Sequence, residues 1–213
     1  GFTLQYELSY TNMLNMLSLG NIPVLASERD DTHPFVMAGG PCAVNPEPLA
    51  DFVDLFVVGE GEEVTLEILD LFGEWKQKGA SRMDFLREAA GIEGVYVPSL
   101  YTVAYHEDGT IQAITPEEGA PGRIRKRIVS DMTAAFYPEE MLVPYMDIVH
   151  NRVVLEVMRG CIRGCRFCQA GFIYRPTRER SVDRLCELGE RLIGATGYEE
   201  MSLSSLSTSD YKE

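Results

Sequence analysis

The chain has 213 residues, 45% of them hydrophobic and 24% charged, a composition that excludes intrinsic disorder, collagen-like repeats and a small disulfide-stapled scaffold. Its net charge of −14 is concentrated in residues 1–120, which hold 5 basic and 20 acidic side chains, against 14 and 13 in residues 121–213. This acidity argues against broad nucleic-acid binding, and the lack of a long apolar run or a signal segment predicts a cytoplasmic protein without membrane contact. We expect a piece of a longer protein, because the sequence opens at Gly1 directly in a strand-like segment.

Residues 1–78 alternate between strand-like and helix-like segments. The continuous apolar run at residues 54–58 is typical of a buried parallel strand. The alternation predicts an α/β fold with a parallel, helix-covered sheet, in which ligands bind beyond the carboxyl ends of the strands. The predicted strands are residues 2–7, 35–38 and 54–58, and the predicted helices are residues 11–19, 46–52 and 63–78.

Three loops follow these strands and carry candidate site residues. Ser9 and Thr11 follow the first strand, Gly39 and Gly40 the second, and Gly59-Glu60-Gly61 the third. Neither the Gly39-Gly40 turn nor the Gly59-Glu60-Gly61 turn has the spacing of a dinucleotide-binding or Walker loop. The acidic side chains of the second of these turns would also repel a bare phosphate. Nicotinamide and ATP sites are therefore not supported, and tight turning alone is the alternative explanation of the glycines.

The alternation stops after residue 78 and resumes near residue 151. Between them a helix and three short strands, two of which form a hairpin, predict a linker with a small sheet. The remainder predicts a strand–helix–strand unit. The predicted elements are a helix at 83–90, strands at 94–97, 102–105 and 111–114, and then a strand at 153–157, a helix at 181–194 and a strand at 200–205.

Three of the five cysteines, Cys161, Cys165 and Cys168, fall within eight positions. Thiolates are soft ligands that suit iron–sulfur clusters or zinc. A structural zinc site requires four ligands, and no histidine lies within ten residues of this group. Three cysteines in one loop favour an iron–sulfur cubane with one open iron, while zinc and coincidence remain the alternatives.

Neighbouring residues have either a supporting role or an ordinary structural one. Glycines let the cysteine loop turn tightly, and three nearby arginines (Arg159, Arg163 and Arg166) can offset the charge of cluster and thiolates. Cys42 and Cys186 are predicted to be small core residues, as are the methionines Met13 and Met16. Glu156, inside an apolar strand, is either a buried polar contact or a site residue.

The spacing Cys161-x3-Cys165-x2-Cys168, with Phe167 before the last cysteine and a strand before the first, resembles the signature of radical S-adenosylmethionine enzymes. In that superfamily the three cysteines hold a [4Fe–4S] cluster, and S-adenosylmethionine chelates the fourth iron. Reduction then cleaves the sulfonium and yields a 5′-deoxyadenosyl radical that abstracts hydrogen. The resemblance implies an electron donor such as flavodoxin or ferredoxin, and it places the backbone of Phe167 against the adenine.

Other segments resemble the subgroup that carries a cobalamin-binding domain ahead of its barrel. They are Tyr6–Leu17, Gly39–Cys42, Gly59–Glu62, Phe172–Ser181 and Ser202–Tyr211. This resemblance implies a truncated Rossmann-like cobalamin-binding-type domain at 1–78, a linker with a small β-sheet at 79–150, and the start of a partial (β/α) radical S-adenosylmethionine barrel at 151–213.

The same resemblance assigns two sets of cofactor-binding residues. S-adenosylmethionine would be contacted by Ser204, Ser205 and Ser207, where relatives carry a glycine-rich motif. The Asp-x-His-x-x-Gly motif of many cobalamin domains is absent, so either cobalamin binds without a protein histidine or the domain keeps the fold without the cofactor. The cobalamin-type site would consist of Ser9, Thr11, Gly39, Gly40, Gly59, Glu60 and Gly61.

The function implied is that of an Fe–S oxidoreductase-type radical enzyme acting on an unidentified substrate. Methyl or methylthio transfer to RNA or protein is an alternative chemistry, on fold analogy alone. A non-catalytic iron–sulfur or zinc module is the alternative from another class. Because the sequence ends after two barrel strands, we expect this fragment alone not to turn over.

Overall fold

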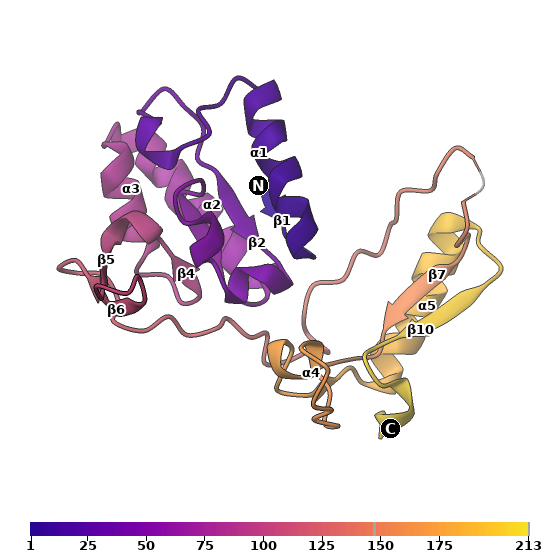
Figure 1. Ribbon diagram of the computed structural model, residues 1–213. Coiled ribbons are helices and arrows are strands. Elements are labelled where there is room, and N and C mark those ends of the chain that lie inside the picture. The colour runs from indigo at the N-terminus through magenta and orange to yellow at the C-terminus, as the bar shows by residue number, and fades with distance from the viewer. Residues whose placement is uncertain (147, 213) are drawn as a thin grey trace. The chain divides into compact units, whose positions relative to one another are not determined.

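The computed structural model describes residues 1–146 and 148–212 and divides into two compact units, residues 1–128 and 129–213 (Figure 1). Residues 79–128, for which a linker was expected, belong to the same compact unit as residues 1–78. The three-part domain division implied by the resemblance stays a prediction. No helix in the described part of the chain is both long and apolar enough to cross a bilayer.

The first unit is built on a four-stranded sheet in the order β1–β2–β3–β4. The first three strands are parallel, with Phe2 opposite Ala38 and Met37 opposite Leu55, while β4 runs antiparallel to β3. The structure thus confirms an α/β chain with a parallel sheet. The strands are β1 (Phe2–Thr3), β2 (Met37–Gly39), β3 (Leu55–Val57) and β4 (Val95–Tyr96).

Helices cover both faces of this sheet (Figure 1). Successive side chains of β3 point to opposite faces, so Phe56 joins one core while Leu55 and Val57 join the other. Helix α1 (Tyr10–Leu19) packs into the first core, and α2 (Gly61–Lys78) and α3 (Arg82–Ala89) pack into the second. Hydrophobic burial on both faces therefore stabilises the unit.

Several expected features of the first unit differ in the structure. Met16 is 59% exposed, because the buried stripe of α1 runs through Met13 and Leu17, one position out of phase. The expected helix at 46–52 is only a 3-10 turn, Glu47–Leu49. Within residues 1–146 and 148–212, the 3-10 turns are Glu7–Ser9, Ala26–Glu28, Pro41–Val44, Glu47–Leu49, Pro98–Leu100 and Thr208–Asp210.

The expected hairpin is present as β5 (Tyr101–Tyr105) and β6 (Ile111–Pro116). The two strands pair antiparallel, with Tyr101 opposite Pro116 and a register irregularity between Ala104 and Tyr105. They form a sheet of their own, separate from the four-stranded one.

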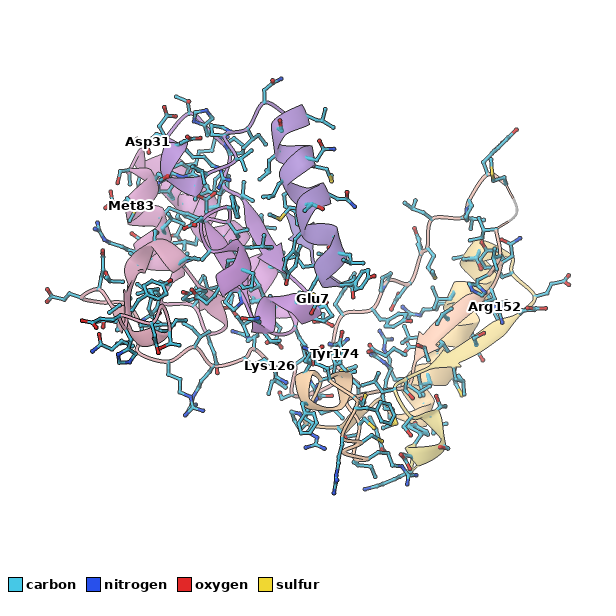
Figure 2. The ribbon with its side chains drawn as sticks, in the orientation of Figure 1. Glu7, Asp31, Met83, Lys126, Arg152 and Tyr174 are labelled. Carbon is cyan, nitrogen blue, oxygen red and sulfur yellow. The ribbon has the colours of Figure 1, made fainter. Side chains whose placement is uncertain are left out.

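A capping box starts α3. The Ser81 hydroxyl accepts a hydrogen bond from the backbone N–H of Asp84, and the Asp84 carboxylate accepts one from the backbone N–H of Ser81. Figure 2 shows Asp31 beside Met83 here, and the Asp31 carboxylate accepts a hydrogen bond from the Arg82 backbone N–H at 2.7 Å. The helix start is therefore satisfied by side chains.

Replacing Ser81 with alanine is expected to lower the free energy of unfolding by about 1 kcal/mol, because the cap hydrogen bonds are lost. Chemical denaturation followed by the fluorescence of Trp75, which packs against Phe85 of α3, measures this change. Ser18→Ala, at an exposed position inside α1, is the matched control and should not destabilise. Equal stability of the Ser81→Ala and wild-type proteins would contradict the prediction.

The second unit contains the expected strand–helix–strand arrangement. Strands β7 (Val153–Glu156) and β10 (Met201–Ser204) are parallel neighbours, from Val153 opposite Met201 to Glu156 opposite Ser204. Helix α5 (Val182–Thr196) buries Leu185, Leu188 and Leu192 against β7. The remaining elements are β8 (Met158–Arg159), β9 (Arg178–Glu179) and the short helix α4 (Ala170–Ile173).

Of the two cysteines expected in a core, the structure buries one. Cys42 is 8% exposed and belongs to the first core, as expected. Cys186 is exposed, because the buried face of α5 is set by Leu185, Leu188 and Leu192 and position 186 lies outside it. Cys186 is therefore a surface residue.

Candidate functional site

The cysteine loop, defined here as residues 160–177, leaves the carboxyl end of β8 and returns into β9. Its base is closed by the antiparallel pairing of Met158 with Glu179 and of Arg159 with Arg178. Gly160 has a φ of +87°, and a Cβ there would lie 2.6 Å from the Pro176 carbonyl oxygen. Only glycine fits this contact between the first and last turns of the loop.

Cys161, Cys165 and Cys168 all lie on this loop as free thiols, with Cys165 exposed and the other two half-buried. The Cys161 sulfur accepts the backbone N–H of Arg163 at 3.5 Å, and the Cys168 N–H donates to the Cys165 carbonyl oxygen at 3.1 Å. Among the described residues, no group of three or more His, Cys, Asp or Glu is placed so that it could hold a metal ion. The loop thus supplies three accessible thiols without assembling them.

This donor set fits an iron–sulfur cluster by its chemistry. Three soft sulfur ligands are available and none is consumed in a disulfide within the described chain. Arg163 and Arg166 are exposed on the same loop, where their charge can offset that of thiolates and cluster. Binding would require the three thiols to converge.

The serine turn, defined here as residues 205–210, follows β10 and lies at the carboxyl end of the sheet. Because β7 and β10 are parallel and Ser204 is opposite Glu156, the segments that follow both strands emerge at one edge. The Ser205 and Thr208 hydroxyls lie 2.8 Å apart, and the Ser207 N–H donates to the Ser205 hydroxyl at 3.1 Å. The turn is therefore ordered by its own hydroxyls.

An ion pair joins the serine turn to the cysteine loop. The Arg163 Nε donates to the Asp210 carboxylate at 2.7 Å, and Nη2 donates to its other oxygen. The Ser207 hydroxyl also donates to this carboxylate, at 2.7 Å. Hydrogen bonds from Arg163 and then Ser207 lower the pKa of Asp210, so it is ionised at neutral pH. A pocket of about 240 Å³ beside the pair is lined by Ile162, Thr177, Glu179, Asp210 and Lys212.

The structure thus places two sets of predicted residues in one neighbourhood. The three cysteines lie on the loop that follows β8, and Ser204, Ser205 and Ser207 lie at the end of β10. Phe167 is 92% exposed, so neither set of residues buries its side chain. Arg163 was expected to offset charge, but the pairing with Asp210 had no signal in the sequence.

Glu156 is a polar contact whose two oxygens are both engaged. Arg159 donates to them from Nε at 2.9 Å and from Nη2 at 2.8 Å. Arg180 is a residue that sequence reasoning missed: its side chain is fully buried, and its guanidinium lies 5.0 Å from the centre of the Tyr137 ring. Burial lowers the pKa of Arg180, and its Nη1 has no hydrogen-bond partner in the described structure. Its position just before a helix gave no sign of burial.

The residues predicted as a cobalamin-type site lie at the carboxyl edge of the first unit's sheet, and some of them already contact other parts of the chain. The Ser9 hydroxyl donates to the Tyr6 carbonyl oxygen at 2.7 Å. A Cβ on Gly40 would lie 2.9 Å from the Leu4 carbonyl oxygen. The predicted residues at this edge are Ser9, Thr11, Gly39, Gly40, Gly59, Glu60 and Gly61.

The loop that contains Gly59, Glu60 and Gly61 is covered by the backbone of Arg127. Gly59 has a φ of +121°, and a Cβ there would lie 2.2 Å from the Arg127 carbonyl oxygen. Arg127 in turn accepts the Glu60 N–H at 3.1 Å and donates its own N–H to Val58 at 2.9 Å. Its guanidinium pairs with Glu63 of α2 at 2.8 Å. As folded here, this edge does not fit a corrin, because the close approach that Gly59 permits is taken by Arg127.

A larger pocket, about 850 Å³, lies at the opposite, amino-terminal end of β2 and β3. Arg29, Asp54 and Arg82 are among its lining residues and form a buried ion-pair network, and the aromatic residues Tyr96 and Tyr101 also line it. The Tyr96 hydroxyl donates to the Glu47 carboxylate at 2.5 Å. Burial, followed by Glu47, raises the pKa of Tyr96. No motif in the sequence indicates a site at this end of the sheet.

Comparisons with known proteins give a family-model match within the first unit and a relative that aligns with nearly the whole chain. Residues 1–98 match a family model described as "Radical SAM proteins, N-terminal". The chain is 29% identical over 213 residues to the uncharacterized protein MJ0966 of Methanocaldococcus jannaschii, covering 99% of this chain and 38% of that protein. It therefore spans well under half of that relative's length. No solved structure matches the chain significantly.

The family match supports a place in the radical S-adenosylmethionine superfamily. It rests on residues 1–98, whereas the resemblance of the cysteine spacing rests on residues 161–168. The two observations therefore come from separate parts of the chain.

Proposed function

We propose that the chain is the cofactor-binding part of a radical S-adenosylmethionine enzyme, with Cys161, Cys165 and Cys168 as ligands of a [4Fe–4S] cluster. One observation carries the proposal: three free thiols share a loop that the Arg163–Asp210 pair ties to the serine turn of a neighbouring parallel strand. The match of residues 1–98 to an N-terminal radical SAM family model supports it independently.

When bound, such a cluster supplies the electron that cleaves S-adenosylmethionine reductively and starts hydrogen abstraction from an unidentified substrate. The chain's own residues bind and orient. Arg163 and Arg166 place positive charge on the loop that would carry an anionic cluster. The Ser207 hydroxyl donates to Asp210, and its oxygen keeps lone pairs that can accept from a cation such as the methionyl ammonium.

The exposed loop also suits delivery of electrons by a protein. Cys165 is exposed and Phe167 beside it is 92% exposed, so a small electron donor such as a flavodoxin or ferredoxin could approach the loop closely. Cobalamin is not part of this proposal, because the chain's own backbone covers Gly40 and Gly59.

The test is anaerobic reconstitution of the full-length protein with iron and sulfide. Changing any one of Cys161, Cys165 or Cys168 to alanine is expected to abolish cluster binding, measured as bound iron and as the EPR signal of the reduced cluster. Cys186→Ala is the matched control, since Cys186 is an exposed cysteine of the same unit, and it should retain the cluster.

The response of the wild-type protein to S-adenosylmethionine distinguishes a radical enzyme from a non-catalytic module. We expect its EPR signal to shift on addition of S-adenosylmethionine, and 5′-deoxyadenosine to form on reduction. A cluster that does not respond to S-adenosylmethionine, or zinc in its place, would identify an iron–sulfur or zinc module instead. Full cluster retention in a cysteine variant would remove that cysteine from the ligand set.

A further inference from the structure

The Arg163–Asp210 pair joins two segments that are far apart in the sequence, as do the pairs of Glu139 with Arg184 and Arg191, which are 45 and 52 residues apart. It is distinguished from the pairs within α5 by the segments that it connects. Arg184–Glu187 and Arg191–Glu187 link neighbouring turns of α5. Arg163 and Asp210 are 47 residues apart and link the cysteine loop to the serine turn. The pair therefore fixes two segments that the sequence separates.

Asp210 is held more tightly than an ordinary surface carboxylate. Its side chain is only 9% exposed, whereas that of Arg163 is 59% exposed. It accepts two hydrogen bonds from Arg163 and a third from Ser207. A two-pronged, charge-assisted contact of this kind sets orientation as well as distance.

The serine turn has few other anchors. None of the residues of its 3-10 turn, Thr208–Asp210, is buried. The next residue, Tyr211, donates its hydroxyl to the Arg180 carbonyl oxygen at 2.7 Å and so fixes one end. The other end is anchored by Ser204, whose carbonyl oxygen accepts the Val157 N–H at 3.0 Å, and Asp210 is the residue that joins the turn between them to the cysteine loop.

We propose that Asp210 is a positioning residue that, through Arg163, holds the serine turn at a fixed distance from the cysteine loop and so pre-organises the S-adenosylmethionine site. The inference rests on the proposed function. A ligand that chelates an iron on the loop and also reaches the serine hydroxyls must bridge both segments. If the two segments are already fixed, binding of the ligand does not cost the conformational entropy of ordering them.

The experiment compares Asp210→Asn, Arg163→Gln and the double variant in the reconstituted full-length protein. Equilibrium dialysis gives the dissociation constant of S-adenosylmethionine, and iron analysis gives the cluster content. Each single variant is expected to weaken S-adenosylmethionine binding about tenfold while retaining its iron. The double variant should bind no more weakly than either single one, because both changes remove the same contact.

A second readout needs neither cluster nor ligand. In the apo-protein, hydrogen exchange of the backbone amides of residues 205–210 is expected to accelerate in both single variants. The control is Glu187→Gln, which breaks the ion pairs of α5 and should change neither exchange in the serine turn nor S-adenosylmethionine binding.

The possible failures are distinguishable. If the wild-type protein holds no cluster that responds to S-adenosylmethionine, the proposed function is wrong. If the wild type responds but both variants bind S-adenosylmethionine as tightly as it does, only the positioning role is wrong. Additive losses in the double variant would also overturn it, as would loss of iron from the single variants, because the pair would then support the loop itself.

Discussion

Replacing Asp54 with alanine is expected to lower the free energy of unfolding of the first unit by about 3–5 kcal/mol. The Asp54 carboxylate accepts from Arg29 at 2.9 Å, from Arg82 at 2.7 Å and from the Val36 backbone N–H at 2.6 Å. All three charged side chains are nearly inaccessible to water. Removing the one anion would leave two buried cations without a counter-charge, which costs more than the loss of an exposed pair.

Trp75 makes this prediction measurable in the first unit alone. It is the single tryptophan of the chain and lies 5.3 Å from the ring of Phe35, over which the Arg82 guanidinium is stacked at 4.0 Å. Its fluorescence during chemical denaturation therefore reports the unfolding of this core.

The matched control is Glu74→Ala, which breaks the exposed pair of Lys78 and Glu74 and should cost less than about 0.5 kcal/mol. Asp54→Asn keeps an acceptor for the Val36 N–H but removes the charge, so its cost should fall between the two. A loss of less than about 1 kcal/mol in Asp54→Ala would show that the buried arginines do not depend on this anion.

The burial of Arg29 and Arg82 could not be predicted from the sequence, whereas several elements of the fold could. The strand at 54–58, the hairpin of strands 102–105 and 111–114 and the strand–helix–strand unit of 153–205 follow from local periodicity, and the structure contains all three with ends that differ by at most two residues. Burial of an arginine has no periodic signal, because composition places it on the surface and its partner lies 25 or 28 residues away. The prediction that Met16 and Cys186 are core residues is wrong for a related reason. A shift of one residue in helical phase moves a side chain from the core to solvent.

The candidate site divides in the same way. The cysteine spacing is local, so the sequence alone predicts a metal or cluster loop. Two other contacts join segments that are 47 or more residues apart: Arg163 with Asp210, and the backbone of Arg127 with Gly59. No short-range sequence pattern predicts contacts of this kind. Gly59 was predicted as a cobalamin-type site residue, with tight turning as the alternative, and the structure shows the backbone of Arg127 close against it.

Replacing Gly160 with alanine is expected to disrupt the cysteine loop and remove most of its bound iron. The new Cβ would lie 2.6 Å from the Pro176 carbonyl oxygen and 2.8 Å from that of Tyr174, the residue after α4 that is labelled in Figure 2. These are backbone atoms at the far end of the loop, so they cannot turn aside as a flexible side chain would. The positive φ of +87° adds strain of about 1–3 kcal/mol for a residue with a Cβ.

Two glycines of the same loop provide graded controls for this substitution. Gly171, in α4, has nothing within 4 Å of the position that an alanine methyl group would take, so Gly171→Ala should leave the iron content unchanged. Gly164 has a φ of +63° but meets only the end of the Arg175 side chain, at 3.3 Å, so alanine there should have an intermediate effect. Iron analysis and EPR of the three reconstituted full-length variants give the order. Wild-type iron content in Gly160→Ala would mean that the contact between the two ends of the loop is not needed to hold the cluster, and that the cysteines can converge on iron from an open loop.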